Sequence, residues 1–194
     1  MIKINGNWQE GFAYDKHSIK SVCIGENQYG YLSFYTDYTD MGKYVNQLKY
    51  KKDINSVLHI IELLSKDSEF NNFIRDIDII LPVPPSNKTR IIQPVFEVAK
   101  EIAKSFKKEI GLDIILSTNT EQVKNLDDSE KLQIVKKSII INDDRLDKSK
   151  NILIFDDIFD SGSTLQAITE ILFEKGFKNI KIFTLTKTRQ KGLI

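Results

Sequence analysis

Residues 152–164 read Ile-Leu-Ile-Phe-Asp-Asp-Ile-Phe-Asp-Ser-Gly-Ser-Thr, and this stretch decides the fold of the 194-residue chain. The four apolar residues at its start are typical of a central parallel strand that is buried on both faces. Asp156 and Asp157 follow directly, so we expect both carboxylates at the carboxyl end of that strand. The small residues after Asp160 predict a tight turn, because glycine and serine let the backbone approach a ligand. A helix should then begin at about Ser163.

The acidic pair and the turn together indicate a site for a sugar phosphate. Adjacent carboxylates accept hydrogen bonds from a sugar diol, and free amides at the start of a helix attract phosphate. Asp156, Asp157 and the turn therefore predict a clamp for ribose phosphate. The competing interpretation is a helix cap, which needs one Asp, Ser or Thr rather than the whole string. Neither a Walker-type loop nor a G-x-G-x-x-G dinucleotide motif occurs in the sequence.

Strand and helix patterns alternate over the last two thirds of the chain. Such alternation predicts right-handed βαβ units and an α/β fold, in which helices flank a mostly parallel sheet. Ligands then bind at the carboxyl ends of the strands. The predicted strands are residues 77–83, 112–116, 138–142, 151–155 and 179–185, and the predicted helices of this part are residues 95–106 and 163–174.

The N-terminal part has a different pattern. Residues 19–35 predict two antiparallel strands and a turn, because β-branched and aromatic residues flank a short polar segment. Amphipathic helices are expected at residues 40–52 and 54–64, packed against the main sheet. We therefore expect a small strand-rich appendage at residues 1–38 and a main domain at residues 39–194.

A polar stretch at residues 117–137 is longer than an ordinary connection. Residues 129–137 have a helical pattern. We expect the whole stretch to form a flexible hood, and residues 117–128 to be the part that moves and excludes water from the site.

A proline-rich loop follows the predicted strand at residues 77–83. Pro84 and Pro85 limit its conformations, and Lys88 and Arg90 supply positive charge. Together with Ser86, these residues predict a cradle for pyrophosphate. Taken alone, such a loop is more often only a stiffened connection.

Residues 152–165 resemble the signature with which type I phosphoribosyltransferases bind 5-phosphoribosyl 1-pyrophosphate (PRPP). The resemblance implies the type I phosphoribosyltransferase fold, Mg²⁺ as cofactor, and phosphoribosyl transfer to a nitrogenous acceptor with release of pyrophosphate. It implies catalytic roles for three carboxylates: Asp156 and Asp157 hold the ribose hydroxyls, directly or through Mg²⁺, and Asp160 faces the nucleophile. The residues implied for the 5′-phosphate are Asp160, Ser161, Gly162, Ser163 and Thr164.

The order of segments along the chain is similar to that in proteins of the ComF family. These are competence-associated proteins with a phosphoribosyltransferase domain. The similarity covers roughly residues 40–185 and includes the helical segment 44–50, the proline loop and the hood. ComF proteins usually begin with a four-cysteine zinc ribbon, whereas this chain has the single cysteine Cys23. The resemblance thus implies a ComF-like subgroup without the ribbon.

The composition indicates an ordinary soluble globular protein, with 41% hydrophobic and 28% charged residues. Lys and Arg number 28 against 27 Asp and Glu, so net charge does not favour nucleic acid or an anionic membrane as a partner. A single cysteine suits a reducing compartment, and no apolar run is long enough for a membrane span. With no signal-peptide pattern at the N-terminus, we expect a cytoplasmic protein.

Three classes of function remain open. We favour a transferase over a sensor that binds PRPP or a nucleotide without chemistry. A competence-type accessory protein for DNA uptake is supported by the ComF resemblance alone. The acceptor, the pathway and the oligomeric state stay open, a homodimer included. His17 and His59 are expected to have structural roles, because neither belongs to a paired ligand motif.

Overall fold

A six-stranded sheet forms the centre of the computed structural model, which describes residues 1–85, 90, 92–118 and 128–188. Every pairing in this sheet is parallel except that of the edge strand β1 with β2. The strand order is β1 (Ile2–Lys3), β2 (Glu10–Lys16), β10 (Ile180–Lys187), β9 (Ile152–Phe159), β5 (Ile79–Pro82) and β6 (Glu109–Ile110). The expected α/β fold with a mostly parallel sheet is confirmed.

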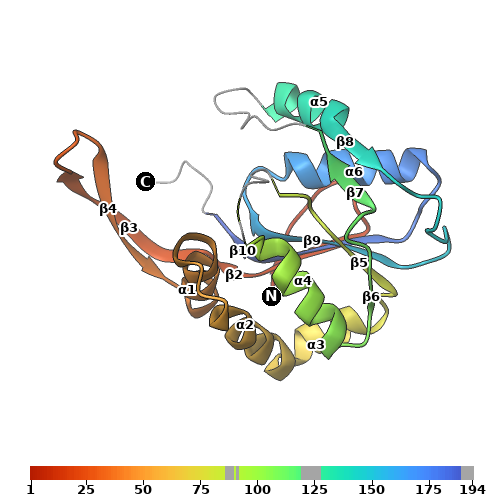
Figure 1. Ribbon diagram of the computed structural model, residues 1–194, viewed down its shortest axis with the longest axis horizontal. Helices are drawn as coiled ribbons and strands as arrows, with labels where there is room; N and C mark the ends of the chain where they lie inside the picture. The colour runs from red at the N-terminus through yellow and green to blue at the C-terminus, as the bar shows by residue number, and fades with distance from the viewer. Residues whose placement is uncertain (86–89, 91, 119–127, 189–194) are drawn as a thin grey trace.

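Helices cover both faces of the sheet (Figure 1). On one face lie α1 (Asp40–Asn46), α2 (Asn55–Lys66), α3 (Ser68–Arg75) and α4 (Pro94–Ser105), and on the other lies α6 (Ser163–Glu174). Side chains of β9 alternate between the two resulting cores: Ile152 and Ile154 pack on the α6 side, and Leu153 and Phe155 on the α1–α4 side. This alternation explains the continuous apolar run, because both faces of β9 are buried.

Strand β9 extends to Phe159, so the acidic pair lies within the last part of the strand. The sequence predicted that the strand would end at Phe155. The neighbouring strand β10 explains the difference, because it keeps pairing with β9 as far as Lys187↔Phe159. Asp156 and Asp157 therefore sit on regular strand backbone, which fixes the directions of their side chains.

The N-terminal residues contribute more to the sheet than the sequence indicated. Strand β2 pairs in parallel with β10, with Phe12 opposite Phe183. Its buried positions on one face are Gly11 and Ala13, and such small residues give only a weak strand pattern. Residues 2–3 and 10–16 thus belong to the main sheet, whereas β3 (Ser18–Glu26) and β4 (Leu32–Tyr38) form a separate two-stranded hairpin. Figure 1 shows this hairpin projecting away from the sheet beyond α1.

The hood is flanked by two strands that were expected in the alternating part of the chain. Strands β7 (Ile115–Ser117) and β8 (Ile139–Ile141) pair with each other in an antiparallel sheet, outside the main one. Between them, α5 (Asp128–Ser138) packs against α6, and Lys136 forms ion pairs with Glu170 at 3.0 Å and Glu174 at 2.7 Å. The expected moving segment falls largely on residues 119–127, which lie outside the described residues.

Only the first half of the predicted helix at residues 40–52 is an α-helix. After α1 the chain forms a π-helix, η1 (Gln47–Lys51), which ends at Lys52 with a left-handed φ of 57°. Thr39 caps α1, and its hydroxyl also donates to Lys16 O at 2.6 Å. A Cβ on Gly42 would lie 1.9 Å from His17 O, so α1 approaches the end of β2 as closely as only glycine allows.

Within the described residues, no helix is both long and apolar enough to cross a membrane.

Candidate functional site

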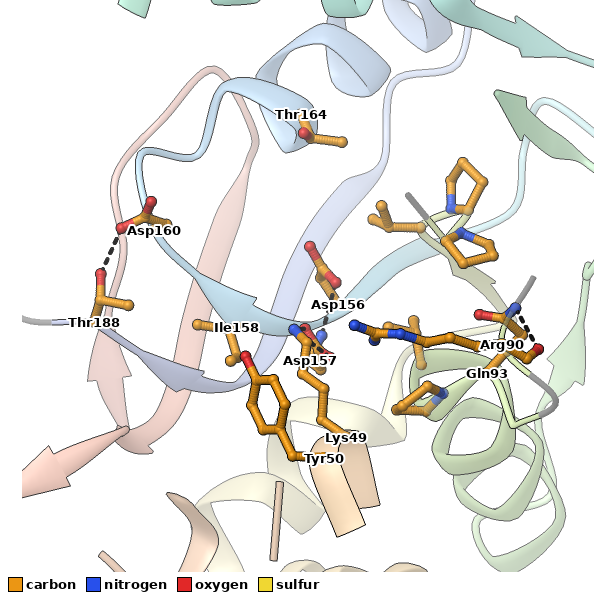
Figure 2. A pocket seen from close by; sticks show the side chains of 15 residues that line it. Lys49, Tyr50, Arg90, Gln93, Asp156, Asp157, Ile158, Asp160, Thr164 and Thr188 are labelled. Carbon is orange, nitrogen blue, oxygen red and sulfur yellow. Dashed lines mark hydrogen bonds and ion pairs between the residues drawn. The ribbon is translucent and has the colours of Figure 1, made fainter. Parts of the chain in front are cut away.

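A pocket of about 500 Å³ opens at the carboxyl end of β9. Figure 2 shows side chains from separate parts of the chain converging on it. Residues that the sequence predicted for the site and that line the pocket are Pro84, Pro85, Arg90, Asp156, Asp157, Asp160 and Thr164. Lining residues for which the sequence predicted no role include Lys49, Tyr50, Gln93, Ile158 and Thr188.

The two adjacent carboxylates have different environments. Asp156 Oδ1 accepts a hydrogen bond of 2.8 Å from the backbone N–H of Asp157. Burial, together with the charge of Asp157, raises the pKa of Asp156 to about 8. The Asp156 carboxyl group therefore keeps its proton to a higher pH than an exposed aspartate does. A cation or a set of hydroxyl donors near Asp156 would favour its ionised form.

Asp157 is buried and forms an ion pair. Lys49 Nζ lies 3.1 Å from Oδ2 and 3.2 Å from Oδ1 of Asp157. Both side chains are mostly buried, so the pair is screened less than a surface pair would be. The negative charge of the acidic pair is thus balanced in part by the protein itself.

Lys49 comes from the π-helix η1, an element that occurs preferentially at functional sites. The Ser56 hydroxyl lies within hydrogen-bond distance of Gln47 Oε1 at 3.3 Å and Asp53 Oδ2 at 3.2 Å, which ties η1 to α2. Sequence reasoning missed Lys49, because helical periodicity does not distinguish a lysine in solvent from one that reaches a strand 108 residues away.

The predicted phosphate loop connects β9 to α6. Gly162 takes a left-handed φ of 80° at the N-cap of α6 and has no side chain that could cap the helix. The hydroxyls of Ser161 and Ser163 are 2.9 Å apart, and Thr164 reaches into the pocket. Backbone amides at the start of α6 and these hydroxyls form a donor-rich turn, which suits a phosphate group.

Aromatic side chains pack against this loop. A Cβ on Gly162 would lie 2.8 Å from the Phe159 ring, which in turn packs edge-on against Trp8 with ring centroids 6.4 Å apart. The Trp8 indole donates to Ile4 O at 3.1 Å. Trp8 therefore packs behind the loop and does not line the pocket.

Asp160 lies at the mouth of the pocket and is exposed. Its Oδ1 accepts a 2.8 Å hydrogen bond from the Thr188 hydroxyl, at the end of β10. This bond fixes the direction of the carboxylate but leaves its second oxygen available to a ligand.

The proline loop supplies the opposite wall of the pocket. Val83 N donates to Phe155 O at 2.8 Å, which continues the pairing of β5 with β9, and Pro84 and Pro85 then line the pocket. The Arg90 guanidinium points toward the acidic pair (Figure 2). Ser86 and Lys88, which were also predicted to bind pyrophosphate, lie outside the described residues.

Both histidines make structural contacts. His17 Nδ1 lies 3.0 Å from the Thr186 hydroxyl, and burial, followed by the nearby charge of Lys49, lowers the pKa of His17. His59 stacks on Tyr44 with ring centroids 4.9 Å apart. Neither histidine lines the pocket.

The donor set fits a magnesium ion that is shared with a ligand. Mg²⁺ is usually held by one or two carboxylates, with the rest of its shell from water and substrate phosphates. Asp156 and Asp157 meet that description, and among the described residues no group of three His, Cys, Asp or Glu forms a cage of its own. Because Asp157 already pairs with Lys49, Asp156 is the carboxylate more open to a metal.

Residues 95–193, just over half of the chain, match the protein family described as phosphoribosyl transferase domain. No curated protein sequence matches the chain.

Two of the solved structures to which this chain is similar are the following phosphoribosyltransferases. Orotate phosphoribosyltransferase from Aeropyrum pernix is 14% identical, with 86% of this chain and 74% of that chain covered and a TM-score of 0.46. Adenine phosphoribosyltransferase from Thermoanaerobacter pseudethanolicus is 15% identical, with 88% and 95% covered and a TM-score of 0.45.

Proposed function

Because the chain belongs to the phosphoribosyl transferase domain family, we propose that its pocket binds PRPP and transfers the phosphoribosyl group to a nitrogenous acceptor. One observation carries this proposal: Asp156, Asp157, Asp160 and Thr164 belong to one strand–turn–helix unit and line the same pocket as Arg90. A ribose 5-phosphate needs a diol acceptor and a phosphate donor set about one sugar apart, and this unit supplies both.

The proposed roles follow from the chemistry of each group. Asp156 and Asp157 accept hydrogen bonds from the ribose 2′ and 3′ hydroxyls, directly or through Mg²⁺. The 5′-phosphate lies against the start of α6, where the donors are the amides and side chains of Ser161, Gly162, Ser163 and Thr164. Arg90, with Pro84 and Pro85 and the loop residues Ser86 and Lys88, receives the pyrophosphate.

In the proposed reaction, the bond between ribose C1 and the pyrophosphate oxygen breaks, and a bond between C1 and the acceptor nitrogen forms. Pyrophosphate leaves with the bonding electron pair, and the acceptor nitrogen gives up a proton. Bound magnesium would supply charge neutralisation on the leaving pyrophosphate. Asp157, oriented by its ion pair with Lys49, stabilises the positive charge that develops on the ribose ring. Asp160 faces the acceptor side and is oriented by Thr188.

Further parts of the proposal concern the setting of the site. The hood at residues 117–137 closes over bound substrate and excludes water. The protein belongs to a ComF-like subgroup and acts in the cytoplasm. Among the described residues, no feature favours the alternative role in DNA uptake.

Calorimetric titration of PRPP with Mg²⁺ tests the binding step. The wild type should bind, the double variant Asp156→Asn/Asp157→Asn should lose binding, and Asp144→Asn, an exposed carboxylate away from the pocket, should bind like the wild type. Absence of binding by folded wild type would rule the proposal out.

Pyrophosphate release then separates a transferase from a sensor. PRPP and Mg²⁺ are supplied with a panel of nucleobases and other nitrogen heterocycles, and free pyrophosphate is measured. Release that depends on one acceptor supports transfer, whereas binding without release for every acceptor supports the sensor.

A further inference from the structure

The hairpin of β3 and β4, residues 18–38, is called the arm below, and it exposes an unusual amount of apolar surface. It carries eight of the fifteen large hydrophobic side chains that are exposed among the described residues. Four are aromatic and 56–74% exposed, and four are aliphatic and 41–66% exposed. They are Tyr29, Tyr31, Phe34 and Tyr35, and Ile19, Val22, Ile24 and Leu32.

An isolated two-stranded ribbon of this kind is marginally stable in water, so a partner is expected to cover it. The base of the arm is held to the body, because Asn46 Nδ2 donates to the Tyr38 hydroxyl at 3.0 Å and the His17 and Tyr38 rings are in contact. Beyond the base, β3 and β4 pair only with each other in the described part of the chain. The arm therefore presents a fixed, uncovered surface rather than a loose tail.

The charge of the arm argues against nucleic acid and anionic membranes. The sequence of the arm contains three charged residues, which are Lys20, Glu26 and Asp37. Lys20 lies directly opposite Asp37 in the pairing of β3 with β4. Polyanionic partners require a basic surface, which the arm lacks. Aromatic residues with little charge are instead typical of the core of a protein–protein interface.

The apolar area that the arm exposes is comparable to that of a standard interface. With about 150–250 Å² for each aromatic side chain, the exposed fractions give about 500 Å² for the four aromatics, and the aliphatics raise the sum to about 900 Å². A standard interface buries about 800 Å² on each partner. A second copy offers the same apolar surface, so a two-fold axis makes the contact self-complementary.

The two edges of the arm differ, which identifies the strand that pairs. Strand β3 has two register shifts against β4, at Ser18/Lys20 and at Cys23/Gly25, and such bulges blunt an edge. The β4 side has no extra residue at either shift, contains no proline, and carries one charge, Asp37. The outer edge of β4 is thus the one competent for further strand pairing.

We propose that this protein forms a homodimer in which the β4 edges of two arms pair antiparallel across a two-fold axis. The apolar side chains of both arms then pack together over a four-stranded intermolecular ribbon. This inference does not depend on the proposed reaction, because the arm does not line the pocket.

Sedimentation equilibrium over about a hundredfold range of concentration tests the proposal. The wild type should be a dimer, and Phe34→Glu/Tyr35→Glu should be a monomer, because the substitutions place like charges on both faces of the paired strands. Leu58→Glu, a substitution on α2 at a side chain that is 63% exposed, should remain a dimer. Thermal unfolding of each variant checks that the body is intact.

Cysteine cross-linking locates the contact. In a Cys23→Ser background, Ser33→Cys and Tyr35→Cys place single thiols along β4, and Leu58→Cys serves as the control. The pairing is supported if disulfide-linked dimers form with a thiol on β4 and do not form with the control thiol at residue 58. A monomeric wild type overturns the proposal and leaves the arm to a different protein, and a dimer that survives the arm substitutions overturns it as well.

Discussion

Lys49 Nζ and the Asp157 carboxylate lie 3.1 Å apart, and this ion pair joins the N-terminal helical segment to the strand that carries the acidic pair. The two residues are 108 positions apart in the chain. One member of the acidic pair therefore has a cation supplied by the fold, whereas Asp156 next to it has a raised pKa. This asymmetry is the basis of the first two predictions.

Replacing Lys49 by Met should weaken ribose 5-phosphate binding by about tenfold or more, because Asp157 loses a charge-assisted contact of about 1.5–3 kcal/mol. The free energy of unfolding should fall by a similar amount, because a buried carboxylate is left without a partner. Calorimetry and urea denaturation measure the two effects. Lys51→Met, on the same π-helix but exposed, is the matched control, and Lys49→Arg should restore most of the loss. Equal affinity in Lys49→Met and Lys51→Met would contradict the role of the ion pair.

Stability without ligand or metal should depend on the ionisation of Asp156. The pKa of Asp156 is about 8 in the fold, against an ordinary value of 3.8, so the folded state holds a proton that the unfolded state releases. The contribution of Asp156 to the free energy of unfolding is therefore greatest below about pH 4 and is lost progressively as pH rises toward about 8. In Asp156→Asn this part of the pH dependence should disappear. Urea denaturation in EDTA across this range measures it, and parallel curves for the two proteins would refute the prediction.

Gly162→Ala should damage the phosphate loop. A left-handed φ costs a non-glycine residue about 1–2 kcal/mol, and the new Cβ would also meet the Phe159 ring at 2.8 Å. Ribose 5-phosphate affinity should fall at least about tenfold. Gly30→Ala is a matched control, because its φ is 77° but no atom lies within 4 Å of the added Cβ. Similar binding by the two variants would show that the loop geometry does not matter for the phosphate.

Arg90→Met should distinguish the pyrophosphate part of the pocket from the ribose phosphate part. Because the guanidinium points into the pocket from the proline loop, its loss should weaken PRPP binding by about tenfold and leave ribose 5-phosphate binding within about twofold. Arg75→Met, at the end of α3 and away from the pocket, controls for loss of positive charge. If the substitution weakens the binding of PRPP and of ribose 5-phosphate equally, Arg90 acts on the acidic pair instead.

Local patterns in the sequence predicted much of the frame of this protein. The apolar run before Asp156, the glycine at the start of α6 and the alternation of strands with helices are properties of neighbouring residues, and the structure confirms the α/β fold that they indicate. The residues that sequence reasoning missed depend on distant contacts. Strand β2 has only a weak strand pattern, because its buried residues are small. Lys49 becomes part of the site only because η1 packs beside β9. Which sheet β7 and β8 join is likewise decided by tertiary pairing, which periodicity cannot report.

Gly42 has a consequence for anyone who redesigns this molecule. It touches no part of the pocket, yet the helix that leads into Lys49 can approach His17 O only because residue 42 has no Cβ. A transplant of the pocket into another scaffold that copied every lining residue but placed alanine at this position would hold the lysine too far from its carboxylate. The unit that must be transferred is therefore larger than the pocket, and it must include the glycine at position 42.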